Sequence, residues 1–272
     1  MVDPISSNSA LGIQQFNKTL NSLNKTQNRI STGLKINGPK DNAAIFAIAQ
    51  VLQGQSAGAA AVKTTLNNAE SVVGTAVSAG QVVGDLLTEI KGKIVQANDP
   101  SLDQSSRDAI GAEVQQLVDQ VNTVASSASF GGTNLIEAGA QDFAVLTSQD
   151  GSTFTVSAQD FSAQGLGIDS LSVATTGGAA SALAAVDNAI TQASSSLANL
   201  GSSAARIADQ GEFTTRLDNV LREGVGNLID ADLGSEAAGL AASRVKEEIG
   251  ARSLAIANAG PKALLSLFPG GG

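Results

Sequence analysis

The chain has 272 residues and a formal net charge of −9, and 42% of its residues are hydrophobic although only 3% are aromatic. Aliphatic residues in this proportion favour long helices packed side by side over a core with large ligand pockets. The acidic balance argues against a nucleic-acid partner, because few Lys and Arg residues are present to displace phosphate counterions.

Four residue types are absent from the sequence: Cys, His, Trp and Tyr. Without Cys the chain can form no disulfide, thiolate nucleophile or zinc–thiolate site. Without His it lacks the commonest metal ligand and the usual general base at neutral pH. We therefore expect no enzymatic activity, no cofactor and no metal ion.

The first residues do not resemble a secretory signal. Met1–Ser9 lacks the basic and apolar regions of a cleaved signal peptide. No run of apolar residues approaches the roughly 18 that a membrane span needs. We expect no membrane insertion, and either a soluble cytoplasmic protein or one exported without a cleaved signal peptide.

Heptad periodicity dominates the N-terminal half. The first predicted helix has apolar residues at steps of three and four, interrupted by Gln27: Ile13, Phe16, Leu20, Leu23 and Ile30. A second series starts at Ile45 and continues to Ala97, with Gln55 as its one polar member. A heptad pattern kept over this length predicts one long helix in a bundle or coiled coil. We expect the helix to end near Asn98–Pro100, because proline cannot continue it.

The same periodicity predicts two more helices, over residues 110–128 and 183–228, and continues at Leu240, Ala251 and Leu254. Arg244 and Glu247 fall on the apolar positions of this last series. The terminal series have little apolar partner surface within one chain, so we expect neighbouring subunits to bury them.

The composition changes between the helices predicted over 110–128 and 183–228, where residues 130–178 are rich in Gly, Thr, Ser and Asp. Phe143–Leu146 and Thr153–Val156 read as two strands, and Asp150-Gly151 predicts the turn of a hairpin between them. Thr175–Gly178 is predicted to be the loop that leads into the next helix.

Both ends of the chain resemble the signatures of bacterial flagellins. The N-terminal motifs are Leu20–Leu23, Arg29–Asn37 and Lys40–Ala44. The C-terminal motifs are Asn227–Asp232 with Glu236, Ser253–Asn258, Pro261 and Leu264–Phe268. Phe130–Leu135 is similar to the short family motif that opens the β section. The resemblance covers roughly residues 5–136 and 179–268, in the order of the family.

The resemblance implies a mainly α fold: a long helical coiled-coil rod with a small β-hairpin section and with the N- and C-terminal helices paired. Three segments follow from it: an N-terminal filament-core helix (1–40), a helical rod with a β section near 130–178 (41–229), and a C-terminal filament-core helix (230–272). The large outer domains of longer flagellins are expected to be absent, because only about 40 residues separate the β motif from the returning helix.

The implied function is that of a structural subunit that self-assembles into the flagellar filament for swimming. Two alternatives stay open: a hook–filament junction protein, and a cell-surface, flagellin-like adhesin or ligand-binding protein. An inserted metallopeptidase is excluded, because a His-Glu-x-x-His motif needs histidine. The implied location is the extracellular flagellum. The implied partners are other copies of the chain, hook–filament junction and filament cap proteins, an export chaperone and the type III export apparatus.

The resemblance also assigns roles to individual residues. Ten are expected to pack subunits together in the filament core: Ile13, Phe16, Leu20, Leu23, Ile30, Leu240, Ala251, Leu254, Leu265 and Phe268. Arg29 is either a solvated helix charge or a contact between subunits. Asp41 is predicted to cap the long helix. Asp230 and Asp232 could form a paired-carboxylate site, but capping of the last helix is favoured, because no basic or nucleophilic residue lies nearby in sequence.

A final expectation concerns the animal Toll-like receptor for flagellin. Strongly activating flagellins place an Arg-rich run on the long helix, and the equivalent run here is Leu87–Ile94. Its receptor-facing residues are expected to be Leu87, Glu89, Lys91 and Lys93. Glu89 reverses one charge, and Lys91 cannot offer the planar fork of an arginine to a carboxylate. We therefore expect a poor receptor agonist.

Overall fold

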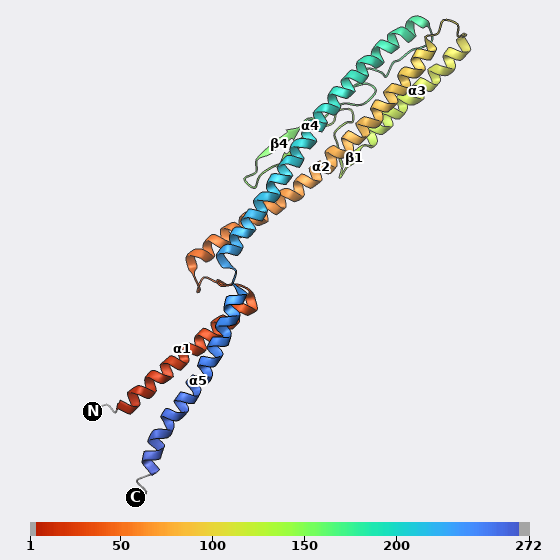
Figure 1. Ribbon diagram of the computed structural model, residues 1–272. Coiled ribbons are helices and arrows are strands. Elements are labelled where there is room, and N and C mark those ends of the chain that lie inside the picture. The colour runs from red at the N-terminus through yellow and green to blue at the C-terminus, as the bar shows by residue number, and fades with distance from the viewer. Residues whose placement is uncertain (1–3, 267–272) are drawn as a thin grey trace. The chain divides into compact units, whose positions relative to one another are not determined.

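The computed structural model describes residues 4–266, with side chains from Ala10 to Ala257 and at Ala259. The chain is mainly helical, with two short hairpins (Figure 1). In chain order the elements are α1 (Pro4–Thr32), α2 (Ala43–Ala97), α3 (Gln104–Ser127), β1 (Ser129–Phe130), β2 (Thr133–Asn134), β3 (Phe143–Leu146), β4 (Thr153–Val156), α4 (Thr176–Ile229) and α5 (Leu233–Ser266). The contacts divide the chain into two compact units. The terminal unit is Met1–Gly54 with Val220–Gly272, and the central unit is Gln55–Asn219.

The long helix predicted from the heptad pattern is α2, and its end at Ala97 is confirmed. Arg107, a buried residue of α3, closes this end by donating hydrogen bonds to the carbonyls of Ala97, Asp99 and Leu102. These carbonyls belong to the helix end and to the turn that follows, where a cation is favourably placed. The Arg107 side chain thus stabilises the end of α2, and Pro100, which has no N–H to donate, prevents the helix from continuing.

The cap predicted for the start of α2 is wrong by one residue. Asn42, not Asp41, caps the helix: its Oδ1 accepts hydrogen bonds from the backbone N–H groups of Ala44 and Ile45, both at 3.1 Å. Asp41 instead accepts a bond from the N–H of Asn37 at 3.1 Å. The N-cap is the residue immediately before the first helical residue, and both side chains can serve, so only the exact start at Ala43 decides between them.

The helices α3 and α4 are longer than their apolar periodicity indicates. α3 begins at Gln104, where Asp103 caps it by accepting from the N–H of Ser106 at 2.8 Å. The bonds from Ser106 lower the pKa of Asp103 below its ordinary value. α4 begins at Thr176, so only the first residue of the predicted loop Thr175–Gly178 lies outside the helix. First turns of helices are often polar, and the heptad pattern does not mark them.

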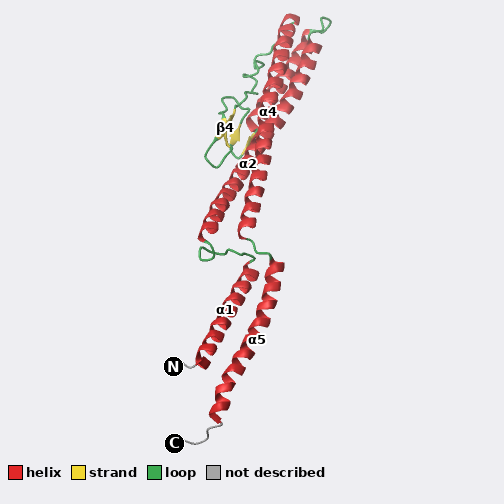
Figure 2. Cartoon of the chain, turned by 60° about the vertical axis from the view of Figure 1, so that its left-hand side comes forward, coloured by secondary structure: helices red, strands yellow, loops and turns green. Residues whose placement is uncertain are grey.

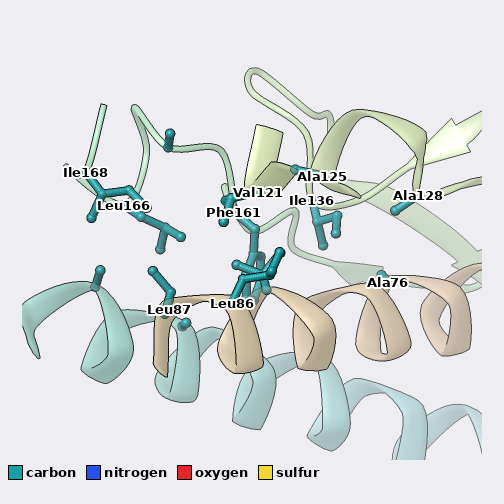
Figure 3. Packing of buried hydrophobic residues seen from close by; sticks show 14 of the residues in the cluster. Ala76, Leu86, Leu87, Val121, Ala125, Ala128, Ile136, Phe161, Leu166 and Ile168 are labelled. Atoms are coloured by element: carbon teal, nitrogen blue, oxygen red, sulfur yellow. The ribbon is translucent and has the colours of Figure 1, made fainter. Parts of the chain in front are cut away.

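The core of the central unit forms where α2, α3 and α4 pack through their apolar faces, as the views in Figures 1 and 2 agree. From Ala59 to Ala97 every member of the predicted α2 series is buried. Residues 135–168 add a layer of apolar side chains that packs against the helices. Figure 3 shows Phe161 and Leu166 from these residues directed at Leu86 and Leu87 of α2. The helices therefore bury one continuous core together with the loop.

The predicted hairpin of β3 and β4 is confirmed, with Phe143 opposite Val156 and Leu146 opposite Thr153. Gly151 in its turn has φ = 88°, a left-handed conformation that glycine adopts without strain. Hydrogen bonds from Ser152 lower the pKa of Asp150 in the same turn. Figure 2 shows the hairpin beside α4. Gln210 of α4 donates to the carbonyl of Thr147 at 2.8 Å and attaches the hairpin there.

The family-like motif Phe130–Leu135 forms a second, smaller hairpin from β1 and β2. Its turn consists of Gly131 (φ 58°) and Gly132 (φ 85°), both left-handed as a tight hairpin turn requires. Asn134 then holds the following loop. Its side chain donates to the carbonyls of Ala125 and Ser126 and accepts from the N–H groups of Ile136 and Glu137.

Among the described residues, α2 is the one helix that is long and apolar enough to cross a membrane by length and composition. Its most apolar 18-residue window has a mean hydropathy of 1.3, with 17% of that window buried within the chain. Core helices of soluble proteins pass the same test, so this property is weak evidence for a membrane span.

Two glycines of α2 should respond in opposite ways to substitution by alanine. A Cβ at Gly74 meets nothing within 4 Å, whereas one at Gly80 would lie 2.9 Å from Leu197 Cδ2 and 3.2 Å from the ring of Phe161. We expect Gly74→Ala to stabilise the central unit by up to about 1 kcal/mol through helix propensity. Gly80→Ala should lose that gain to overpacking. Urea unfolding followed by circular dichroism measures both, and equal stabilisation by the two variants would contradict the packing described here.

Candidate functional site

The terminal unit pairs α1 with α5, helices far apart in the sequence (Figure 1). Each helix sets one large side chain against a glycine of the other. Phe16 lies against Gly250, where an added Cβ would be 3.1 Å from its ring, and Leu254 lies against Gly12, where the distance would be 3.0 Å. Small residues opposite large ones allow the two backbones to approach closely.

The described members of the predicted packing set fall into three groups on this pair. Leu23 is buried, and Phe16, Leu20, Ile30, Leu240 and Leu254 are half-buried. Ile13 and Ala251 are exposed and lie outside the contact between the two helices. The side chain of Leu265 and all of Phe268 lie outside the described residues. The assignment of the set to contacts between subunits stays a prediction.

The two charges that interrupt the C-terminal heptad series differ in their burial. Arg244 is exposed and Glu247 is half-buried. The half-buried positions of this stretch are Ser243, Glu247 and Gly250, with Leu254 one turn further on. The contact face of α5 therefore departs from the heptad series at two positions, with Ser243 in place of Arg244 and Gly250 in place of Ala251, and these small residues allow a close approach of the helices.

The pairing of α1 with α5 leaves apolar side chains of both helices uncovered. Within the described residues, large hydrophobic side chains that remain more than half exposed on these two helices are Leu11, Leu233, Val245, Ile249 and Ile256. A shallow apolar groove of about 460 Å³ runs between the helices beside Phe16, Ile249 and Leu254. Sequence reasoning missed these exposed residues, although Ile249 and Ile256 are one heptad apart and could have indicated a second apolar face.

Residues 33–42, between α1 and α2, bring the two ends of the chain together. The N–H groups of Lys35 and Ile36 donate to the carbonyl of Ile229, at 2.7 and 3.3 Å, and the N–H of Ala231 donates to the carbonyl of Gly33 at 2.8 Å. Ile36, Ala49 and Ile229 form a small core beneath this contact. Ala49 is buried in this core, whereas Ile48, the member of the α2 series three residues after Ile45, is 52% exposed. The motifs of both termini therefore meet at one joint.

Arg29 contributes an ion pair to the same unit. Its Nη1 lies 2.8 Å from Oε1 of Glu236, and the two side chains are 31% and 17% exposed. Within the described residues, Nε of Arg29 is the one buried side-chain nitrogen or oxygen that lacks a hydrogen-bond partner. Arg29 borders a polar hollow of about 450 Å³ whose lining includes Lys25, Asn37 and Asp41.

The cap predicted for Asp232 is confirmed: its Oδ1 accepts from the N–H groups of Gly234 and Ser235, at 3.0 and 3.1 Å, in the first turn of α5. Asp230 does not cap the helix and forms a β-bridge with Leu34 instead. The described residues contain no group of three or more acidic side chains that could hold a metal ion. The structure thus gives Asp232 a structural role.

Two models of one protein family match most of this sequence. Residues 5–141 match the bacterial flagellin N-terminal helical region, and residues 183–268 match the bacterial flagellin C-terminal helical region. Flagellin FljO of Caulobacter vibrioides is 38% identical over 263 residues, which cover 96% of each chain. The chain belongs to the flagellin family. A flagellin of Brucella melitensis is 32% identical over 284 residues and covers 99% of this chain and 100% of its own.

Two solved structures share the fold. Bacillus cereus flagellin has a TM-score of 0.51 at 21% identity and covers 55% of this chain and 88% of its own. A putative flagellar hook-associated protein from Vibrio parahaemolyticus has a TM-score of 0.59 at 11% identity and covers 70% of this chain and 100% of its own. At these identities the likeness concerns the fold alone. The short flagellin fold predicted from the sequence is confirmed.

The run expected to face a receptor is only partly accessible in this flagellin. Leu87 is fully buried in the central core, so its assignment to a receptor surface is wrong. Glu89 is exposed. Nζ of Lys91 lies 2.7 Å from Asp187, and Lys93 pairs with Glu113 at 2.5 Å. The hydrogen bond and the charge of Glu113 raise the pKa of Lys93. Both lysines are thus bound to carboxylates of the chain itself.

The ion pair of Arg29 and Glu236 should stabilise the terminal unit measurably. We expect a double-mutant cycle with Arg29→Met and Glu236→Gln to give a coupling free energy of about 1 kcal/mol, since both side chains are partly shielded from water. This coupling should fall as salt is added. The exposed pair Arg252 and Glu248 is the control, because its charges face solvent. Unfolding in urea measures both cycles, and equal couplings would show that shielding is unimportant.

Proposed function

We propose that this flagellin is a structural subunit whose copies pack through α1 and α5 into an extracellular flagellar filament. The observation that carries the proposal is the apolar surface left over when α1 and α5 pair. A monomer gains nothing from keeping Val245, Ile249 and Ile256 in water, whereas neighbouring copies that cover them remove this area from solvent. Because the same helices repeat on every subunit, contacts between unlike faces can continue without closing.

Support also comes from the relatives, which are named flagellins and match nearly the whole chain. The match leaves no room for a large inserted domain with an activity of its own, and we propose that the protein is not an enzyme. The apolar face at the start of α2 is proposed to be covered by protein rather than lipid. The hook–filament junction, the filament cap, an export chaperone and the type III export apparatus are the further partners that we propose, together with export that leaves the N-terminus uncleaved.

We propose that the ten packing residues serve the filament core in two ways, within a subunit and between subunits. Leu23, Phe16 and Leu254 hold α1 and α5 together within a subunit, while Ile13 and Ala251 face outward and are available to a neighbour. Arg29 is proposed to act both within a subunit and between subunits. Its Nη1 binds Glu236 within the chain, and the exposed part of its side chain, 31% of the total, is available to an acceptor group of a neighbouring copy.

A hook–filament junction protein is the second candidate, because the hook-associated structure from Vibrio parahaemolyticus is covered completely by the fold of this chain. The two functions differ in what the purified chain does alone. A filament subunit elongates filament seeds without limit, whereas a junction protein stops after a short assembly. Electron microscopy of seeded samples separates them, and short, terminated structures would favour the junction protein.

A charge placed inside the α1–α5 contact should prevent assembly. We expect Phe16→Asp and Leu254→Asp to abolish filament growth. Burying a carboxylate in an apolar contact costs about 3 kcal/mol or more. The central unit should remain folded, since neither residue belongs to it. Sedimentation and electron microscopy measure assembly, and circular dichroism measures folding.

The matched control is Asn17→Asp, which adds the same charge at an exposed position next to Phe16. We expect it to assemble far better than Phe16→Asp. Normal filaments from Phe16→Asp or Leu254→Asp would show that the position does not lie in a packed contact of the filament.

We propose that this flagellin is a poor agonist of the Toll-like receptor for flagellin. Exposed Glu89 presents a negative charge, and Lys91 and Lys93 are already paired with Asp187 and Glu113. A mismatched charge at an interface commonly weakens binding strongly. Dose–response curves on receptor-bearing reporter cells measure the effect, and Glu89→Arg should recover only part of the signal. Potency equal to that of a strongly activating flagellin would refute the proposal.

A further inference from the structure

The segment that joins α1 to α2 contains an asparagine followed by glycine, Asn37-Gly38, and no other asparagine in the chain precedes a glycine. An asparagine side chain can cyclise onto the backbone nitrogen of the next residue. Glycine in that position allows the reaction best, because it has no Cβ to obstruct the approach and its backbone adopts the widest range of angles. Asparagine is accordingly counted among the thermolabile residues.

The structure leaves the side chain of Asn37 exposed and the N–H of Gly38 without a hydrogen-bond acceptor among the described residues. Asn37 is exposed and lies outside the helices and strands. Its side chain borders the polar hollow beside Lys25 and Arg29, where water has access. Among the described residues none accepts a hydrogen bond from the N–H of Gly38. A Cβ at Gly38 would meet nothing within 4 Å, so there is open space on the side-chain side of this glycine.

Other asparagines near this joint and in the loops are protected by comparison. Asn42 precedes an alanine, and its Oδ1 accepts two backbone hydrogen bonds at the start of α2. Asn134 is 8% exposed and holds four backbone groups with its side chain. Rotation of either side chain towards the next backbone nitrogen would break these bonds. Asn37 has no such restraint on its side chain among the described residues.

We propose that Asn37 is a self-modifying site at which this chain deamidates before any of its other asparagines. The backbone nitrogen of Gly38 loses its proton to solvent base and attacks Cγ of Asn37. The new N–Cγ bond forms as the Cγ–Nδ2 bond breaks, and Nδ2 takes up a proton and leaves as ammonia. Water then opens the succinimide at either carbonyl carbon, and the product is aspartate or isoaspartate at position 37.

Both products change the joint that connects the two ends of the chain. Each adds a negative charge close to Asp41, whose carboxylate already accepts the N–H of Asn37. Isoaspartate also inserts a methylene group into the backbone, one residue beyond the bonds of Lys35 and Ile36 to Ile229. The modified subunit therefore differs from the unmodified one in charge at position 37 and, when the product is isoaspartate, also in backbone length there.

The test is to incubate the purified full-length chain in mildly alkaline buffer and to follow its peptides by mass spectrometry. We expect the mass gain of deamidation to appear at Asn37 well before it appears at exposed Asn17 or Asn227, which precede lysine and leucine. Labelling with an isoaspartyl methyltransferase should mark the same peptide. A more acidic species should accumulate on anion exchange at the same rate.

The matched control is Gly38→Ala, which the open space around Gly38 accommodates. We expect conversion at Asn37 to slow by about tenfold or more in this variant, because a Cβ obstructs the cyclisation. Gln in place of asparagine (Asn37→Gln) should remove the acidic species. The proposal is overturned if Asn37 converts no faster than Asn17 and Asn227, or if Gly38→Ala leaves its rate unchanged. It is also overturned if a free peptide of residues 33–42 converts while the folded chain does not.

Discussion

The apolar face of α2 is the feature on which the rest of the central unit depends. α3, α4 and the loop residues 135–168 bury their own apolar side chains in one core with it. Aromatic residues are few, so the burial comes from many small aliphatic contacts. Such a core has little tolerance for lost volume, because each methylene contributes to a closely packed interior.

The terminal unit is constructed differently. Its buried core of Ile36, Ala49 and Ile229 is small, and α1 and α5 meet through glycines and half-buried side chains. Directed interactions supply much of its order: the backbone bonds of residues 33–36 to the end of α4, the Asp232 cap and the Arg29–Glu236 pair. A unit with little buried area is marginal alone, and this is the physical basis for expecting neighbouring copies to complete it.

Glycine has two separate uses in the fold. In the hairpin turns, Gly131, Gly132 and Gly151 adopt positive φ values that side chains disfavour. In the helices, Gly12 and Gly250 face Leu254 and Phe16, and Gly80 faces Leu197 and Phe161. Helical glycines weaken an isolated helix. These helices therefore depend on the packing that the glycines permit, and the sequence pattern alone does not show which glycines serve this purpose.

The sequence by itself determined the long helix α2, the β3–β4 hairpin, the family and the cap at Asp232, since each depends on local periodicity or on residues close together in the chain. Only the tertiary structure decided that Asn42 rather than Asp41 caps α2, that Leu87 is buried, and that Arg29 binds Glu236. Heptad spacing shows that a helix has an apolar face, but it does not show which residues that face meets. Arg29 and Glu236 are more than two hundred positions apart, so their pairing follows from how the helices pack. The burial of a residue such as Leu87 follows from what covers the face on which it lies.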